Sequence, residues 1–268
     1  MITDWSDAYA NGKYIAYADS FPPRWTAEAA AYRSALGRRA LLDLPYGDQP
    51  RQRFDRFLPE GTPKGFAVFV HGGYWMAFDK STWSHLAAGA NARGWAVCLP
   101  SYTLAPQVRL SDMTTEILWA ITEAAVRVGG PIRLAGHSAG GHLVTRAACA
   151  EVALPVADRL QHVLSISGLH DLRPLLRTDM NETLRLDQAE ATAESAALRI
   201  PRTGVSLTTW VGADERPEFI RQTDLLANIW TGLGIETRSH HAAGKHHFNV
   251  IEPLTKADSD ITKAFVGD

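Results

Sequence analysis

The sequence predicts an α/β protein with a mostly parallel, doubly wound sheet. Continuously apolar runs such as residues 66–70 recur along the chain, helical stretches separate them, and glycine-rich turns follow two of them. Strands that are apolar on both faces are typical of a parallel sheet covered by helices, and strand–helix alternation implies right-handed crossovers. With 268 residues, of which 46% are hydrophobic, the chain can bury a sizeable core, so we expect a single domain over residues 1–268.

The N-terminal part of the chain is the least regular. Residues 1–50 carry scattered aromatic residues and prolines and are expected to form an N-terminal arm, with a short helix over 27–36 that ends at Gly37. Residues 52–58 alternate charged and apolar side chains, which is the period of a half-exposed strand and suggests an antiparallel edge. Residues 66–70 then predict a buried strand.

The remaining elements follow in strict alternation, with one interruption. Residues 168–201 are rich in Leu, Arg, Asp and Glu, and we interpret them as a small helical cap inserted over the carboxyl edge of the sheet. The other expected elements are helix 81–93, strand 95–99, helix 111–128, strand 132–135, helix 139–151, strand 163–167, strand 205–211, a helix near 217–230, strand 236–240 and a last helix after Phe248.

The most informative stretch is Gly136-His137-Ser138-Ala139-Gly140, between a predicted strand and a predicted helix. In a G-x-S-x-G turn of this kind the serine is held in a strained conformation, and the residues two positions before and after it must be small. The turn would lift the Ser138 hydroxyl clear of the sheet and aim the Ala139 N–H at an oxyanion. In the earlier loop, Gly72 and Gly73 would let further N–H groups approach that oxyanion without a Cβ in the way.

A serine nucleophile needs a general base, and the base needs a carboxylate to orient it. His247 and its neighbour His246 lie after the final predicted strand, where the base of such a fold is expected. Asp214 and Glu215 follow the strand that ends near residue 211, so the order is nucleophile, acid, histidine. Spacing alone does not separate Asp214 from Glu215. These positions predict an α/β-hydrolase fold with a Ser–His–acid triad.

Taken together, four motifs resemble the kynurenine formamidase (arylformamidase) group of α/β-hydrolases. They are His71-Gly72-Gly73-Tyr74-Trp75, the serine pentapeptide, Pro217-Glu218-Phe219 and His247-Phe248-Asn249, and the similarity spans residues 45–255. The resemblance implies hydrolysis of N-formyl-L-kynurenine, and of simple aryl esters, without metal or cofactor. It also implies Ser138 as the nucleophile, His247 as the base and Glu215 ahead of Asp214 as the acid.

The loop after the first buried strand suggests how such an enzyme would select its acyl group. Tyr74 stands where related lipase-like esterases carry a third glycine, which favours formamidase over general esterase. Tyr74 and Trp75 are expected to wall a narrow acyl site that accepts a formyl group, while an aryl leaving group could stack on Trp75 or Phe78. His71, His137 and His142 are interpreted as bracing or packing residues.

Charge and cysteine content exclude several kinds of partner. A net charge of -2, a pI near 6.6 and the lack of basic clusters argue against nucleic acid or an anionic membrane. No apolar run is long enough to span a membrane, no secretion signal is recognised, and the two cysteines, Cys98 and Cys149, are expected to be reduced. We therefore expect a cytoplasmic protein with a small-molecule substrate, and a homodimer stays open.

Three other functions compete with deformylation. A short-chain carboxylesterase would use the same triad, and a non-catalytic protein of this fold would only bind a small ligand. A metal-dependent amidase would use the late histidines at positions 240, 241, 246 and 247. These histidines lack helix-spaced ligands and an accompanying acidic motif, so no metal site is predicted.

Overall fold

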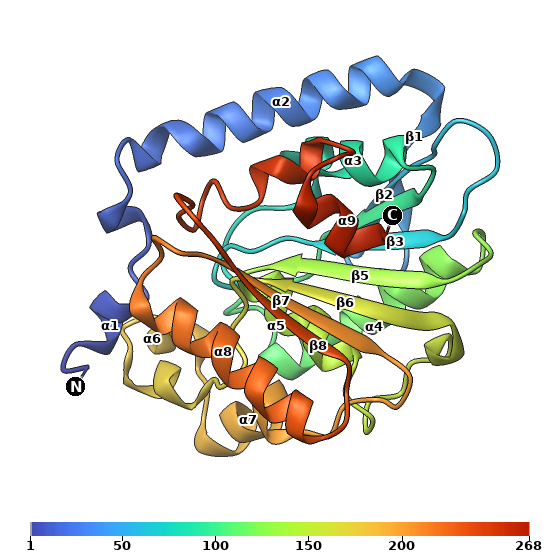
Figure 1. Ribbon diagram of the computed structural model, residues 1–268. Helices are drawn as coiled ribbons and strands as arrows, with labels where there is room; N and C mark the ends of the chain where they lie inside the picture. The colour runs from blue at the N-terminus through green and yellow to red at the C-terminus, as the bar shows by residue number, and fades with distance from the viewer. Residues whose placement is uncertain (1, 268) are drawn as a thin grey trace.

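A sheet of eight strands forms the centre of the molecule (Figure 1), which the computed structural model describes over residues 2–267. Its strand order is β1-β2-β4-β3-β5-β6-β7-β8, in which β2 runs antiparallel to β1 and β4 and the other neighbours are parallel. The predicted mostly parallel, doubly wound sheet is confirmed. The strands are β1 (Ala40–Pro45), β2 (Arg53–Phe57), β3 (Phe66–Val70), β4 (Ala96–Pro100), β5 (Ile132–His137), β6 (Leu160–Ile166), β7 (Ser206–Gly212) and β8 (Thr237–Ala242).

Helices cover both faces of the sheet. Helices α2, α3 and α9 lie on one face, and α4, α5 and α8 lie on the other, with α6 and α7 beside α8 (Figure 1). The α-helices are α1 (Trp5–Ala8), α2 (Phe21–Leu36), α3 (Ala88–Ala92), α4 (Leu110–Ala125), α5 (Ala139–Ala147), α6 (Asn181–Leu184), α7 (Gln188–Ala193), α8 (Pro217–Gly232) and α9 (Asp260–Val266).

Short 3₁₀ helices fill several of the connections. The single helix expected over 81–93 is instead two 3₁₀ helices followed by α3, and the last helix is preceded by another 3₁₀ turn. These segments are η1 (Gly12–Tyr14), η2 (Ala18–Ser20), η3 (Gly37–Arg39), η4 (Lys80–Thr82), η5 (Ser84–Ala87), η6 (Ala157–Arg159), η7 (Arg173–Arg177), η8 (Ala196–Leu198) and η9 (Glu252–Thr255).

Strand β2 is not the half-exposed edge that its alternating pattern suggests. It is antiparallel as expected, but β1 pairs with its outer side and forms the edge of the sheet. The charged side chain of Asp55 is buried because Lys80 Nζ lies 2.8 Å from its carboxylate, in an ion pair that is itself buried. A pattern of charges in a strand indicates solvent only when those charges have no partner inside the protein.

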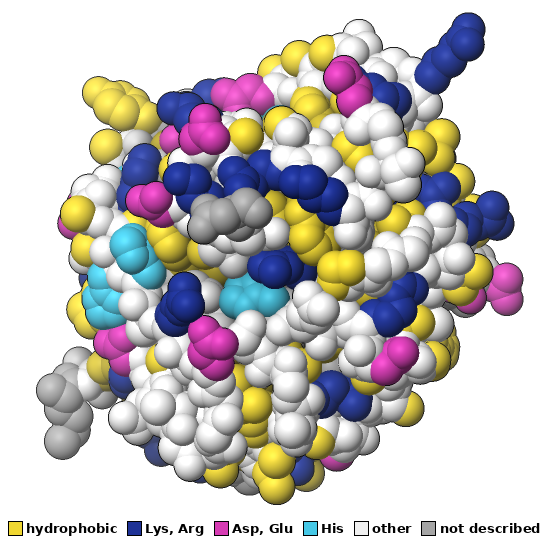
Figure 2. Space-filling model, turned by 45° about the vertical axis from the view of Figure 1, so that its right-hand side comes forward, with side chains coloured by type: hydrophobic (Ala, Val, Ile, Leu, Met, Phe, Trp, Pro, Cys, Tyr) yellow, Lys and Arg dark blue, Asp and Glu magenta, His cyan; other side chains and the backbone are white. Residues whose placement is uncertain are grey.

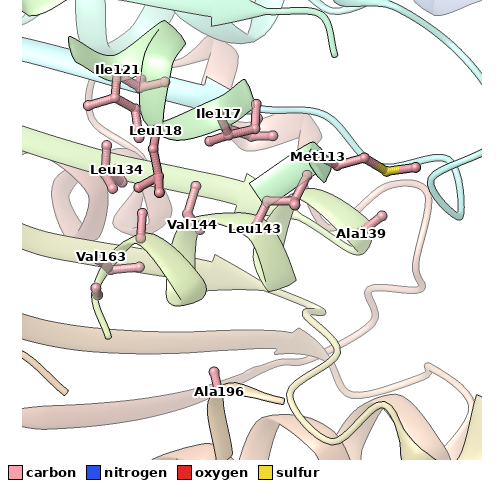
Figure 3. Close-up of a cluster of buried hydrophobic side chains, with 14 of the residues drawn as sticks. Met113, Ile117, Leu118, Ile121, Leu134, Ala139, Leu143, Val144, Val163 and Ala196 are labelled. Carbon is pink, nitrogen blue, oxygen red and sulfur yellow. The ribbon is translucent and has the colours of Figure 1, made fainter. Parts of the chain in front are cut away.

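The central helices pack on the sheet through small and branched apolar side chains. In α4 the buried residues recur every three or four positions, as on one face of a helix. Figure 3 shows this stripe of α4 against α5 and against strands β5 and β6. The residues labelled there are Met113, Ile117, Leu118, Ile121, Leu134, Ala139, Leu143, Val144, Val163 and Ala196.

The segment 168–201 forms the short helices η7, α6, α7 and η8, as its composition predicts. Its side chains contact the α4, α5 and α8 layer: Thr114 donates to the Glu194 carboxylate, and Trp230 Nε1–H donates to the Ala196 carbonyl. The segment therefore lies against the helices on one face of the sheet. Its role as a cap over the site stays a prediction.

The surface carries charges of both signs. On the face shown in Figure 2, Lys and Arg side chains are interspersed with Asp and Glu, and several basic ones gather above a hollow that contains a histidine. Within residues 2–267, none of the helices combines the length and the apolar character that crossing a membrane requires.

Helix α2 is longer than expected, because it begins at Phe21 with Pro22 and Pro23 in its first turn, where proline is tolerated. Its end at Gly37 agrees with the prediction. The helix is anchored by Trp25, which is 3% exposed and whose ring centroid lies 4.6 Å from that of Trp83 and 5.5 Å from that of Phe248.

Replacing Trp25 by alanine should therefore lower the free energy of unfolding by about 3–5 kcal/mol, the usual cost of removing a large core aromatic. The matched control is Trp119→Ala on α4, since Trp119 is 51% exposed and should cost less than half as much. Urea denaturation of both variants measures the difference. Equal losses would contradict the anchoring role of Trp25.

Candidate active site

The turn between β5 and α5 places Ser138 in a strained backbone conformation. Its φ is 55° and its ψ is -116°, in a region that residues with a side chain rarely occupy. The turn closes tightly because a Cβ at Gly136 would overlap the carbonyl of Gly140, and one at Gly140 would overlap the carbonyl of Val70. Glycine at both positions therefore lets α5 begin directly against the ends of β3 and β5.

His247 and Glu215 form a short hydrogen bond in this region. His247 lies in the segment after β8 and Glu215 in the loop after β7, and His247 Nδ1–H donates to Glu215 Oε2 at 2.6 Å. The other carboxylate oxygen, Oε1, accepts from the Ser167 hydroxyl at 2.6 Å and from the Gly212 N–H at 2.8 Å. Both side chains are buried, so this carboxylate is held by three hydrogen bonds away from water.

The structure brings Glu215, and not Asp214, to the histidine. Asp214 is exposed, its backbone N–H donates to the Lys245 carbonyl at 3.0 Å, and among the described residues its carboxylate forms no hydrogen bond with the imidazole. His246, the other candidate base, has its Nδ1 bound to the Phe248 N–H at 3.2 Å. The structure therefore favours Glu215 over Asp214 as the acid and His247 over His246 as the base, the two choices that sequence spacing left open.

His137 links the segments that carry Ser138 and His247, because it directly precedes Ser138 and its ring contacts His247. The rings of His137 and His247 have centroids 4.6 Å apart, and His137 Nε2–H donates to the His247 carbonyl at 3.0 Å. Burial lowers the pKa of His137 well below its ordinary value, so this ring is a neutral donor. Among residues 2–267 no hydrogen bond joins the Ser138 hydroxyl to the His247 ring. Such contacts often tighten only when substrate binds.

The loop after β3 passes close to the serine. Gly73 has a φ of 112°, and a Cβ at Gly72 would lie 3.0 Å from the Ser138 Cβ. Within the described chain the N–H groups of Gly72 and Gly73 have no acceptor, while the Gly73 carbonyl accepts from Met76 and Ala77. Two unused donors therefore lie beside the turn at Ser138, where Ala139 supplies the first N–H of α5.

His71 braces this loop rather than reacting in it. Its Nδ1–H donates to the Gly72 carbonyl at 2.7 Å, and its ring stacks on that of Tyr102 with centroids 4.7 Å apart. Burial lowers the pKa of His71 to about 4, so the ring is neutral at ordinary pH.

The two aromatic residues of the loop point in different directions. Tyr74 Oη–H donates to the Tyr9 carbonyl at 2.6 Å and accepts from Asn11 Nδ2–H at 3.2 Å, so it holds the N-terminal arm. Trp75 is fully buried, and its Nε1–H donates to His142 Nδ1 at 3.2 Å. In this structure Trp75 braces the loop from the core and does not line a site. Phe78 likewise packs on Trp25 and Trp83.

A hollow of about 170 Å³ opens beside the imidazole. One side is formed by residues 214–217 together with His246 and His247, and the other by Asn11, Tyr14 and Ile15. The N-terminal arm, not segment 168–201, supplies the opposite wall among the described residues. The aromatic residues of the arm were the one sequence signal for this wall, and no spacing connected them to the site.

Within residues 2–267, neither the larger hollow nor the late histidines combine a serine with a histidine that is paired to a carboxylate. A hollow of about 580 Å³ lies between α9 and the strands β7 and β8. It contains a hydroxyl beside an imidazole, Ser206 and His162 at 2.8 Å, but among the described residues no carboxylate pairs with that ring. The late histidines have separate partners: His240 stacks on Trp210 and His241 pairs with Asp224. Across residues 2–267, no three His, Cys, Asp or Glu side chains are grouped so that they could hold a metal ion.

Comparison with known proteins finds similarity to hydrolases. A model described as the Alpha/beta hydrolase family matches residues 67–259. The chain is 24% identical to a kynurenine formamidase of Danio rerio, over 98% of this chain and 97% of that protein. It is 29% identical to a kynurenine formamidase of Drosophila melanogaster, over 82% of this chain and 78% of that protein.

A solved structure is closer in sequence. A protein of Silicibacter sp. TM1040, named provisionally as a thioesterase, shares 53% identity with this chain and superposes with a TM-score of 0.93. The match covers 97% of this chain and 98% of that one.

The buried His142 predicts a pH dependence of stability. Its Nε2–H donates to the Glu194 carbonyl at 2.9 Å, and burial lowers its pKa from 6.5 to about 4. Below pH 6.5 the unfolded chain takes up a proton at this ring and the folded protein does not, so stability falls until the pH reaches about 4. Between pH 6.5 and 5 this one residue should cost about 2 kcal/mol.

Urea denaturation at pH 7.5 and pH 5 measures this loss. In His142→Gln, which cannot titrate, the loss of stability on acidification should be smaller by about the same 2 kcal/mol. The other buried histidines are unchanged in both proteins and serve as an internal control. An identical loss in wild type and variant would contradict the assignment.

Proposed function

The chain belongs to the alpha/beta hydrolase family, and on that premise we propose that it is a serine hydrolase that removes the formyl group from aryl formamides such as N-formyl-L-kynurenine. The observation that carries the proposal is the buried hydrogen bond from His247 to Glu215 beside the strained Ser138. Similarity to kynurenine formamidases over nearly the whole chain supports a formamide as the substrate.

In the first step the Ser138 hydroxyl attacks the formyl carbon. His247 accepts the hydroxyl proton at Nε2, because its Nδ1–H is already engaged by Glu215. Negative charge develops on the formyl oxygen, and the N–H groups of Gly72, Gly73 and Ala139 are the donors that stabilise it. The Glu215 carboxylate stabilises the imidazolium that forms, and its bonds to Ser167 and Gly212 keep it oriented.

In the second step the imidazolium returns a proton. It donates to the aniline nitrogen, the carbon–nitrogen bond breaks, and the amine leaves a formyl ester on Ser138. A water molecule then gives a proton to His247 and attacks the same carbon. As the bond from that carbon to Ser138 Oγ breaks, His247 returns the proton to Oγ, and formic acid leaves and ionises to formate. Ser138 is 2% exposed, and this burial restricts access to its hydroxyl, which favours the smallest acyl group.

A second candidate function is hydrolysis of a short-chain ester or thioester. The observation that favours it is the 53% identity to the Silicibacter protein named provisionally as a thioesterase. The same nucleophile, base and oxyanion donors would serve both reactions, and only the leaving group differs. Rates measured in parallel on N-formyl-L-kynurenine and on a p-nitrophenyl acetate ester separate the two. Ester turnover without deformylation would replace the first candidate by the second.

Replacing Ser138 by alanine should lower kcat by at least about 10³-fold on either substrate, because it removes the nucleophile. The measurement is release of formate or p-nitrophenol under saturating substrate. Labelling by a fluorophosphonate probe should disappear in the same variant and persist in wild type. Wild-type turnover by Ser138→Ala, or no labelling of the wild-type protein, would favour a protein that only binds its ligand.

The neighbouring acids Glu215 and Asp214 provide a test variant and its matched control. Glu215→Gln should lower kcat by about 10²–10⁴-fold, because His247 loses the carboxylate that orients it and stabilises its charge. Asp214→Asn should lower kcat far less, since the Asp214 side chain is exposed and makes no contact with the imidazole. Formanilide hydrolysis measures both. The reverse ranking would mean that Asp214 is the orienting acid.

A further inference from the structure

The hollow beside His247 contains polar groups that the proposed reaction does not use. Asn11 is 2% exposed, yet its Oδ1 accepts no hydrogen bond from any described residue. The Nε–H of Arg216 is also buried and donates to none of them. Both residues line the same hollow of about 170 Å³. A buried polar atom without a partner costs free energy, so an acceptor and a donor left open in one hollow indicate a ligand.

Arg216 is held in place and keeps part of its guanidinium free. One Nη2 donates to the Asp7 carboxylate at 2.6 Å, and the guanidinium lies 3.8 Å from the centroid of the Tyr14 ring. The Tyr14 hydroxyl donates to the same Asp7 carboxylate at 2.8 Å. These contacts fix the plane of the guanidinium, which is the arrangement that suits a carboxylate.

The start of α8 adds to the attraction for an anion. Arg216 occupies the N-cap position of this helix of 16 residues, and no side chain caps its first turn. The N-terminal end of a helix carries partial positive charge, which favours a carboxylate at this place.

The hollow also offers acceptors for a cation. Asp214 lines it with an exposed carboxylate on the same wall as Arg216, and the open Oδ1 of Asn11 is an acceptor on the facing wall. An ammonium group carries three donors and no acceptor, so it matches these two oxygens.

We propose that this hollow binds the zwitterionic head group of an α-amino acid substrate. Arg216 takes the carboxylate, and Asn11 and Asp214 take the ammonium. The inference rests on the proposed function, because it assumes that the reacting formamide lies between Ser138 and His247, at the end of the hollow that His247 lines. With about 170 Å³, the hollow holds a head group and leaves the aryl formamide outside it, towards Ser138.

The first test compares N-formyl-L-kynurenine with formanilide, which has the reacting group but no head group. In Arg216→Gln the ratio of kcat/KM between the two substrates should fall by about tenfold, mainly through a higher KM for N-formyl-L-kynurenine. An unchanged ratio would overturn the proposal.

The matched control is Asp7→Asn. It breaks the same ion pair with Arg216 but leaves the guanidinium in the chain, so the ratio should fall clearly less than in Arg216→Gln, where the group that takes the carboxylate is removed. If Asp7→Asn lowers the ratio as much as Arg216→Gln does, the pair only fastens the N-terminal arm and the proposal is wrong.

The ammonium half is tested with the desamino analogue of N-formyl-L-kynurenine. Asn11→Ala should reduce the preference of the enzyme for the substrate over this analogue. An equal loss on both compounds would reject Asn11 as an ammonium acceptor.

Binding of kynurenine, the amino acid product, gives a readout that needs no turnover. Calorimetry should show weaker binding to Arg216→Gln than to wild type and to Asp7→Asn. Formanilide hydrolysis that depends on Ser138, together with no loss of kynurenine binding in Arg216→Gln, would reject the head-group site and leave the proposed function intact. Kynurenine binding that depends on Arg216 in a protein without deformylase activity would reject the proposed reaction alone.

Discussion

The close approach of the α5 backbone to the ends of β3 and β5 is the constraint on which the site depends. Carbonyl groups of Gly140 and Val70 occupy the space where side chains at Gly136 and Gly140 would stand. Only glycine lets the helix begin at that point, and this beginning forces Ser138 to a φ of 55°. The β3 loop then reaches the same point from the neighbouring strand, which brings its free amides to the serine.

The parallel order of the strands explains why residues far apart in the chain meet here. The carboxyl ends of β3, β5, β6, β7 and β8 lie side by side at one edge of the sheet. The loops that follow them supply the glycine amides, the serine, the Ser167 hydroxyl, Glu215 and His247 in turn. A site at such an edge is the usual outcome for an open parallel sheet, because neighbouring loops converge there.

The sequence predicted the parts of the site that local chemistry determines. Glycine spacing identified the turn at Ser138, and the chain order of acid and histidine limited the other partners to two pairs of neighbours. Choosing between Asp214 and Glu215 needed the three-dimensional structure, because the groups that bind the Glu215 carboxylate, His247 and Ser167, come from distant parts of the chain.

The features that the sequence did not predict depend on contacts between distant segments. Strand β2 looked half-exposed because its charged residues alternate, whereas Lys80 and β1 cover them in the fold. Trp75 looked like a wall of the acyl site, but the T-shaped contact with His142 and the hydrogen bond to it draw its ring into the core. The arm was recognised as a segment, yet its place at the site follows from Tyr9, whose hydroxyl donates to the buried Glu218.

Tyr74 belongs to the loop of Gly72 and Gly73, the proposed oxyanion donors, and its hydroxyl also fastens the arm through the Tyr9 carbonyl and Asn11. The first residues of the chain are thereby joined to the reaction centre while contributing no strand to the sheet. Substrate choice and the alignment of the reacting groups are thus assigned to different parts of the chain. Relatives with the same serine, histidine and acid can acquire new substrates by altering a terminal segment of about a dozen residues, without disturbing the scaffold that aligns the reacting groups.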